Sequence, residues 1–161
     1  MVENGEDDAL SAGLTGALTP FGHVIKARVY FADTDFSGVV YHARYLEFLE
    51  RGRSDYLRLS GIHHTELADG KHGERIVWVV RRIEIDFRAP ARIDDILTVE
   101  TRTERISGAR IFMRQTILRG TEILIEAKVE AAIIGERGRP KRFPAEWIER
   151  FLPKGDDRDP Q

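Results

Sequence analysis

VYFADTDFSGVVYHARYLEFLERGR, residues 29–53, is the stretch of the chain that decides the fold. Up to its third residue, apolar and polar side chains alternate, which is the pattern of a half-buried strand. An acidic turn containing Gly38 follows, and beyond it apolar residues recur at helical spacing. The stretch therefore predicts a strand, a turn and a long helix. The strand residues on the apolar face are Ile25, Ala27, Val29 and Phe31.

The predicted helix has His42 as its N-cap and Ala43 as its first residue, and Gly61 ends it. No Ser, Thr, Asp or Asn occupies the cap, although these residues are preferred there, so the first N–H groups lack a side-chain acceptor. Gly52 lies on the apolar stripe, where the missing side chain lets the helix approach its neighbour closely. The rest of the stripe is Tyr45, Leu46, Phe48, Leu49, Tyr56 and Leu59.

Asp33 and Asp35 lie at the start of this helix. Free N–H groups at a helix N-terminus suit an anion or a developing oxyanion. A carboxylate a few residues upstream supplies a base or a nucleophile. An acyl-transfer hydrolase needs both features, although an Asp in a glycine-containing turn is, by position alone, more often a turn or capping residue.

Two strings carry a family resemblance. RVYFADTDFSGVVYHARYLEFLE, residues 28–50, resembles the signature of hotdog-fold acyl-CoA thioesterases, in particular the YbgC branch of the 4-hydroxybenzoyl-CoA thioesterase family. VVRRIEIDFRAPARIDDILTVET, residues 79–101, also resembles that branch. The resemblance spans residues 23–134 in all. The sequence departs from the branch at Phe31, where many members carry tyrosine.

The resemblance implies roles for two residues of the turn. Asp35 aligns with the catalytic carboxylate of these thioesterases and would act either as general base on water or as nucleophile. His42 would take part through its backbone N–H, which polarises the thioester carbonyl, or through its side chain. Asp33 is expected to hold the turn.

Substrate contacts are expected beside Asp35 and at strand ends, where arginines would meet the phosphates of CoA. No metal is expected, because the adjacent His63 and His64 lack a defined ligand geometry and the chain has no cysteine. The expected substrate-binding residues are Gly38, Val39 and Tyr41 in the turn, and Arg88, Arg105 and Arg110 at strand ends.

Four more strand-like segments follow the helix, and a short helix closes the domain. One long helix and five strands with short links predict an α+β fold, with an antiparallel sheet packed on the helix. The resemblance implies the hotdog arrangement, in which the five-stranded sheet wraps around the central helix. The four strands are expected at 76–87, 96–105, 110–118 and 122–134, and the closing helix at 144–152.

The composition bounds the domains and the class of protein. The 161 residues, 42% hydrophobic and 32% charged, predict one globular domain at 23–153 between flexible tails, an acidic one at 1–22 and another at 154–161. Without the tails the formal charge is +3, too small an excess for a nucleic-acid partner. No apolar run is long enough for a membrane span, and the missing cysteines fit a cytoplasmic location.

The expected substrate is an acyl or aromatic acyl thioester, with CoA or carrier-bound pantetheine as part of the substrate and no other cofactor. The resemblance implies self-association through the sheet into a dimer or homotetramer, with the site between subunits, and an acyl carrier protein is a further candidate partner. Two alternatives stay open: a non-catalytic or weakly catalytic acyl-thioester-binding protein linked to envelope or phospholipid functions, and a hotdog hydratase or dehydratase.

Overall fold

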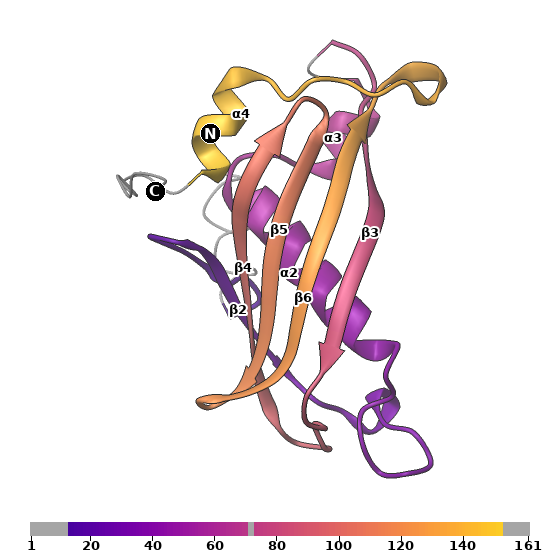
Figure 1. Cartoon of the computed structure of the whole chain (residues 1–161), viewed down its shortest axis with the longest axis vertical. Helices are drawn as coiled ribbons and strands as arrows, with labels where there is room; N and C mark the ends of the chain where they lie inside the picture. The colour runs from indigo at the N-terminus through magenta and orange to yellow at the C-terminus, as the bar shows by residue number, and fades with distance from the viewer. Residues whose placement is uncertain (1–12, 71–72, 153–161) are drawn as a thin grey trace, which may run out of the picture.

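The computed structural model describes residues 13–70 and 73–152. Within them, a six-stranded antiparallel sheet in the order β1-β2-β4-β5-β6-β3 curves around the long helix α2 (Figure 1). The strands are β1 (Ala17–Thr19), β2 (Gly22–Arg28), β3 (Val77–Phe87), β4 (Ile96–Ser107), β5 (Arg110–Arg119) and β6 (Glu122–Ile134). The helices are η1 (Phe31–Asp33), α2 (Arg44–Leu59), α3 (His64–Ala68), η2 (Glu136–Gly138) and α4 (Ala145–Phe151).

Alternation and tight turns build the sheet. On β5, for example, Ile111, Met113 and Ile117 are buried while their neighbours are more exposed, because successive side chains point to opposite faces. Gly108 and Gly120 are the first residues of the two-residue turns β4–β5 and β5–β6, with φ of 61° and 59°. Glycine at that position suits the type II′ hairpin turn. The predicted α+β class, with a sheet around one central helix, is confirmed.

Two details correct the sequence analysis. β2 ends at Arg28, and Phe31 leaves the sheet for η1 with 80% of its surface exposed. The N-cap of α2 is Ala43 instead of His42, because the chain enters the helix through a turn in which Arg44 N–H donates to Tyr41 O. The absence of a side-chain cap is confirmed.

The sixth strand, β1, lies inside the segment 1–22 that was expected to be a tail. Ala17 pairs with Val24 of β2, and the N–H of Gly16 donates to Asp55 Oδ2 at 2.8 Å. These bonds extend the folded region to residues before 23. Residues 1–12 and the predicted C-terminal tail lie outside the described residues.

Gly52 sets the height of α2 above the sheet, as its place on the apolar stripe predicted. A Cβ atom there would lie 3.0 Å from Val99, 3.1 Å from Thr101 and 3.2 Å from Gln115. Two apolar clusters fill the space between helix and sheet. One holds Tyr45, Phe48, Leu49, Leu97, Ile117 and Ile125, and the other holds Tyr56, Leu57, Ile111, Met113, Val129 and Ile133.

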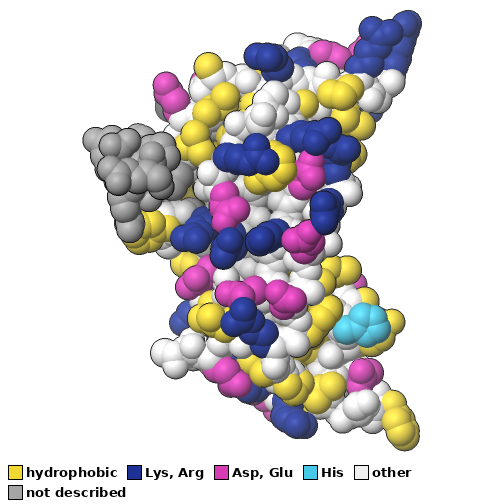
Figure 2. Space-filling view, in the orientation of Figure 1, with side chains coloured by type: hydrophobic (Ala, Val, Ile, Leu, Met, Phe, Trp, Pro, Cys, Tyr) yellow, Lys and Arg dark blue, Asp and Glu magenta, His cyan; other side chains and the backbone are white. Residues whose placement is uncertain are grey.

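The face of the sheet turned away from α2 carries charged side chains of both signs (Figure 2). Arg102, Arg114 and Lys128 lie opposite one another on β4, β5 and β6. Arg114 pairs with Glu104 at 2.8 Å. The apolar core of the described chain therefore lies on the α2 side of the sheet.

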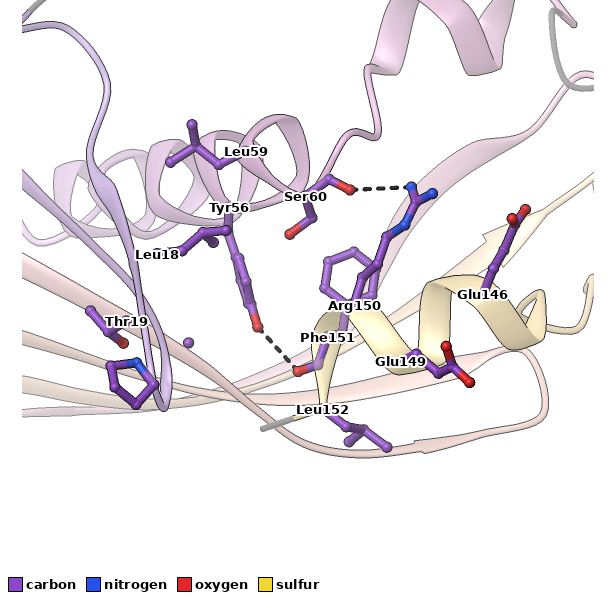
Figure 3. A pocket seen from close by; sticks show the side chains of 12 residues that line it. Leu18, Thr19, Tyr56, Leu59, Ser60, Glu146, Glu149, Arg150, Phe151 and Leu152 are labelled. Atoms are coloured by element: carbon purple, nitrogen blue, oxygen red, sulfur yellow. Dashed lines mark hydrogen bonds between the residues drawn. The ribbon is translucent and has the colours of Figure 1, made fainter. Parts of the chain in front are cut away.

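Helix α4 closes one end of the core. The hydroxyl of Tyr56 donates to the carbonyl of Phe151 at 3.1 Å, and Arg150 donates to the carbonyl of Ser60 at 3.2 Å (Figure 3). Beside these contacts is a groove of about 670 Å³ between α4 and the β1–β2 turn. The two bonds tie α4 to the C-terminal end of α2, where Gly61, at φ of 82°, follows the cap as predicted.

A buried hydrogen bond between two side chains ties β2 to α2. His23 Nε2 lies 2.7 Å from Asp55 Oδ2, and both side chains are at most 6% exposed. Burial opposes ionisation of Asp55, but hydrogen bonds from His23, Gly16 N–H and Arg58 outweigh it, so the pKa of Asp55 lies below its ordinary value.

Asp55→Asn should therefore destabilise the protein in a pH-dependent way. A lowered folded-state pKa contributes stability above the unfolded pKa, and that contribution is lost as the pH falls through the folded pKa. We expect a loss of about 1–3 kcal/mol in the free energy of unfolding at pH 7, because hydrogen bonds to a buried charge are removed. Urea unfolding at a series of pH values should show that the difference in free energy of unfolding between wild type and variant shrinks below pH ~4. A difference that does not change with pH would contradict the lowered pKa of Asp55 in the folded protein.

Candidate active site

The turn that carries Asp35 is a narrow hairpin. Asp35 N–H donates to Val39 O at 2.9 Å, and Gly38 N–H donates back to Asp35 O at 3.0 Å. The Asp35 carboxylate accepts the N–H of Ser37 at 2.7 Å. Gly38 has φ of 79°, in the left-handed region that glycine adopts without strain. The turn therefore presents an exposed carboxylate on a hydrogen-bonded backbone.

Asp33 holds the base of this turn, in the role expected for it. One of its carboxylate oxygens accepts the N–H of Tyr30 at 2.9 Å, and the other lies 3.5 Å from Arg44 Nε. Its backbone carbonyl accepts the N–H of Tyr41 at 2.9 Å. These contacts join η1, the turn and the start of α2, so the charge of Asp33 is engaged in the structure.

Helix α2 begins directly after the turn without a side-chain cap. Within the described residues, the N–H groups of His42 and Ala43 make no hydrogen bond to the protein. Unpaired N–H groups at a helix N-terminus carry a partial positive charge. A negative charge that develops beside them would therefore meet two donors.

The His42 ring belongs to a row of aromatic side chains. Its centroid lies 4.6 Å from that of Tyr41 and 6.4 Å from that of Phe87, which it meets edge-on. Phe87 in turn lies 5.9 Å from Tyr45 of α2. His42 and Tyr41 are exposed in the single chain, so their faces are open to a ligand. The structure places Asp35 and His42 on adjoining segments at one end of α2.

The turn lies against the connection between β3 and β4, residues 88–95. Val40 N–H donates to Ala91 O at 2.9 Å, and Val39 forms an antiparallel bridge with Arg92. Apart from Arg88, the sequence analysis missed this connection as part of the site. No local signal marks it, because the contacts join residues about fifty positions apart in the sequence and backbone atoms carry most of them.

Asp95 and Arg119 brace the same connection. Asp95 Oδ2 accepts the N–H of Arg92 at 2.9 Å and lies 2.7 Å from Arg119 Nη1. Desolvation opposes ionisation of Asp95, but these two donors outweigh it and lower the pKa of Asp95. Asp94, at φ of 70°, and Asp95 form the turn before β4.

The three predicted arginines are divided between the two ends of the sheet. Arg88 follows β3 at the same end as the Asp35 turn and forms an ion pair with Glu126. Arg105 and Arg110 flank the β4–β5 turn, roughly 30 Å along β4 from the connection that contacts the Asp35 turn. Of these three arginines, Arg88 alone lies at the same end of the sheet as the Asp35 turn within one chain.

Arg105 and Arg110 have partners of their own on the charged face of the sheet. The guanidinium of Arg105 lies 3.7 Å from the ring centroid of Phe112, a cation–π contact. Arg110 pairs with Glu130 at 3.1 Å. Arg105 stays exposed and the Arg110 side chain is 51% exposed, so a ligand phosphate can still reach both.

The adjacent histidines lie away from the turn. His63 is the N-cap of α3 and His64 is its first residue. Among the described residues no group of three or more metal-ligating side chains is found, and no helix is both long and apolar enough to cross a membrane.

Comparisons with known proteins show which family the chain resembles. The family model of the thioesterase superfamily matches residues 37–126, more than half of the chain, including Gly38, Val39, Tyr41 and His42. The match begins two residues after Asp35. The chain is 39% identical over 126 residues to acyl-CoA thioesterase YbgC of Haemophilus influenzae, covering 78% of this chain and 90% of that protein.

Solved structures show the same fold. A probable thioesterase from Bartonella henselae is 58% identical and superposes with a TM-score of 0.74, covering 76% of this chain and 99% of its own. A Thermus thermophilus thioesterase, solved in complex with coenzyme A and zinc, is 26% identical with a TM-score of 0.66, covering 82% and 91% of the two chains.

Gly38→Ala should test the backbone of the turn. A Cβ atom there would meet nothing within 4 Å, so the substitution causes no steric clash. Its cost is the backbone strain of alanine at a positive φ, about 1–2 kcal/mol. We expect a lower kcat with little change in melting temperature, because the strain is confined to an exposed turn that can shift locally. Gly38→Asn, which tolerates this conformation better, should retain more activity. Equal activity in the alanine variant and wild type would show that the turn conformation is irrelevant to turnover.

Proposed function

This chain belongs to the thioesterase superfamily and is a thioester hydrolase, and we propose that it cleaves acyl-CoA at the turn that carries Asp35. One observation carries the assignment: the exposed Asp35 carboxylate and the unpaired N–H groups at the start of α2 lie on adjoining segments. The first group can activate water or attack a carbonyl, and the second can stabilise the oxyanion that results.

The reaction follows from the chemistry of a thioester. Asp35 takes a proton from water as the water oxygen bonds to the carbonyl carbon, and the carbonyl oxygen becomes an oxyanion beside the His42 and Ala43 N–H groups. The C–S bond then breaks, and the CoA thiolate takes up the proton. In the alternative course, the Asp35 carboxylate attacks the carbon directly and water hydrolyses the mixed anhydride. Both courses need the charge of Asp35.

Acyl-CoA is the substrate that the relatives favour, since the Haemophilus protein is named for it and the Thermus structure contains coenzyme A. Pantetheine on an acyl carrier protein offers the same thioester. A hydratase would change the unsaturation of the acyl chain without releasing thiol, and a non-catalytic binder would do neither. A cytoplasmic location, and the lack of a further cofactor, stay predictions.

We expect the active form to be an oligomer joined through β3. This strand is one of the two edges of the described sheet, is eleven residues long, and has β6 as its ladder partner on one side only. An unpaired edge of this length is a template for another strand. Val77, Val80 and Phe87 on it are each about half exposed, which is costly in water.

Antiparallel pairing of two such edges explains the divided arginines. It would set the Phe87 end of β3 beside the Val77 end of the second copy. The Val77 end lies in the same part of the sheet as Arg110, because β6 pairs with both strands there. Arg105 and Arg110 of the partner subunit would therefore come toward the Asp35 turn, where the phosphates of CoA need cations.

Asp35→Asn should lower kcat by at least about two orders of magnitude. The change keeps the size of the side chain but removes the charge that both courses need. Binding of acyl-CoA should persist, because the start of α2 is unchanged. Steady-state thiol release and equilibrium binding measure the two effects.

Asp33→Asn is the matched control, since it makes the same change two residues away. It should lower the melting temperature more than kcat, because Asp33 is tied to Tyr30 and Arg44. Near wild-type hydrolysis by Asp35→Asn, together with an inactive Asp33→Asn, would show that the wrong carboxylate has been assigned. Full activity in both variants would exclude this turn as the site.

Val80→Lys should disrupt the assembly. Lysine on an exposed edge strand opposes edge-to-edge pairing. Sedimentation velocity at micromolar concentration should show a dimer or tetramer for the wild type and a shift toward monomer, with loss of activity, for the variant. A stable and active wild-type monomer would contradict a site shared between subunits.

A further inference from the structure

Tyr45 lies in the first turn of α2, but its hydroxyl contacts a different segment of the chain. The residue is only 3% exposed, and the N–H of Ala91 donates to the hydroxyl oxygen at 2.9 Å. Burial raises the pKa of Tyr45, so the hydroxyl remains neutral around pH 7. Ala91 itself is fully buried, so water does not reach its N–H group, and the Tyr45 hydroxyl is the acceptor for that group. The bond fixes the connection 88–95 relative to the helix.

The same residue, Ala91, supports the Asp35 turn. Its carbonyl accepts the N–H of Val40 at 2.9 Å, and the neighbouring Arg92 bridges Val39. Val39 O in turn accepts the N–H of Asp35 at 2.9 Å. A continuous series of hydrogen bonds therefore runs from the Tyr45 hydroxyl through Ala91 to the backbone of the hairpin that carries the carboxylate.

The ring of Tyr45 supports the other side of the site. It packs against Phe87 with a centroid distance of 5.9 Å and an angle of 61° between the rings. Phe87 meets the His42 ring edge-on at 86°. Phe87 is the last residue of β3 and half exposed, so Tyr45 is its buried aromatic support.

We propose that Tyr45 is a positioning residue for thioester hydrolysis, which holds the Asp35 turn through its hydroxyl and His42 through its ring. The inference rests on the proposed function, because it concerns the same site. Tyr45 is buried behind the turn and reaches the substrate only through these two contacts. Its hydroxyl sets where the carboxylate lies, and misplacement by about 1 Å is enough to lower a rate by about a hundredfold.

Tyr56 provides a matched control on the same helix. It is 2% exposed, and its hydroxyl also bonds to a backbone group, the carbonyl of Phe151 at 3.1 Å (Figure 3). It lies eleven residues further along α2, about three helical turns from Tyr45. Replacing either tyrosine by phenylalanine removes one buried hydroxyl and leaves the ring. Both variants should lower the melting temperature by a similar amount.

The two variants should differ in catalysis. Tyr45→Phe should lower kcat about ten- to a hundredfold with the KM for acyl-CoA unchanged, whereas Tyr56→Phe should leave both constants unchanged. Hydrogen exchange should show faster exchange of the Val40 and Ala91 amides in Tyr45→Phe alone. Tyr45→Leu, which also removes the ring contact with Phe87, should lose more activity than Tyr45→Phe.

The outcomes separate this inference from the proposed function. An inactive Asp35→Asn with a fully active Tyr45→Phe would overturn the inference and leave the proposed function intact. Parallel losses of kcat in Tyr45→Phe and Tyr56→Phe would also overturn it, because they would reflect general destabilisation. Full activity in Asp35→Asn would overturn the proposed site and the inference together.

Discussion

The structure depends on the close approach of α2 to the sheet at Gly52. Any side chain there would begin 3.0–3.2 Å from the strands beneath it. Gln115, fully buried below this point, donates to Leu49 O at 2.9 Å and to Thr101 Oγ1 at 2.8 Å, and it accepts from Arg53 at 2.9 Å. These polar bonds satisfy the buried amide and fix the helix in height and along its axis. The position of the helix start follows from this contact.

A rigid helix alone does not position the Asp35 carboxylate, because Asp35 lies on an exposed turn before the helix begins. The turn obtains its rigidity from the connection 88–95, which is held by Tyr45 on one side and by the Asp95–Arg119 pair on the other. The unpaired N–H groups at the start of α2 then adjoin a turn whose backbone is restrained. In the proposed assembly, a second subunit paired along the β3 edge completes the surroundings of this turn.

The sequence predicted most of the fold and the position of the candidate site, but few of the contacts that hold the site together. Hydrophobic periodicity identified α2 and the long strands. The missing side chain of glycine predicted the close approach at Gly52 and the helix end at Gly61. The strand β1 escaped prediction because three residues are too few to show a periodic pattern. Its position depends on pairing with β2 and on the bond from Gly16 N–H to the buried Asp55 carboxylate. The support of the turn by Tyr45 and Ala91 escaped it too, since a stripe residue of an amphipathic helix gives no sign that its hydroxyl has a distant backbone partner. The roles of Asp35 and His42 came from the family resemblance, and they stay predictions.

The measurement that tests this account most directly is thiol release by the wild-type protein over a panel of short-chain, long-chain and aromatic acyl-CoAs, with the acid product quantified in parallel. The account predicts catalytic turnover of at least one class, with thiol and free acid formed in equal amounts. Tight binding of acyl-CoA with no thiol released from any member of the panel would contradict it.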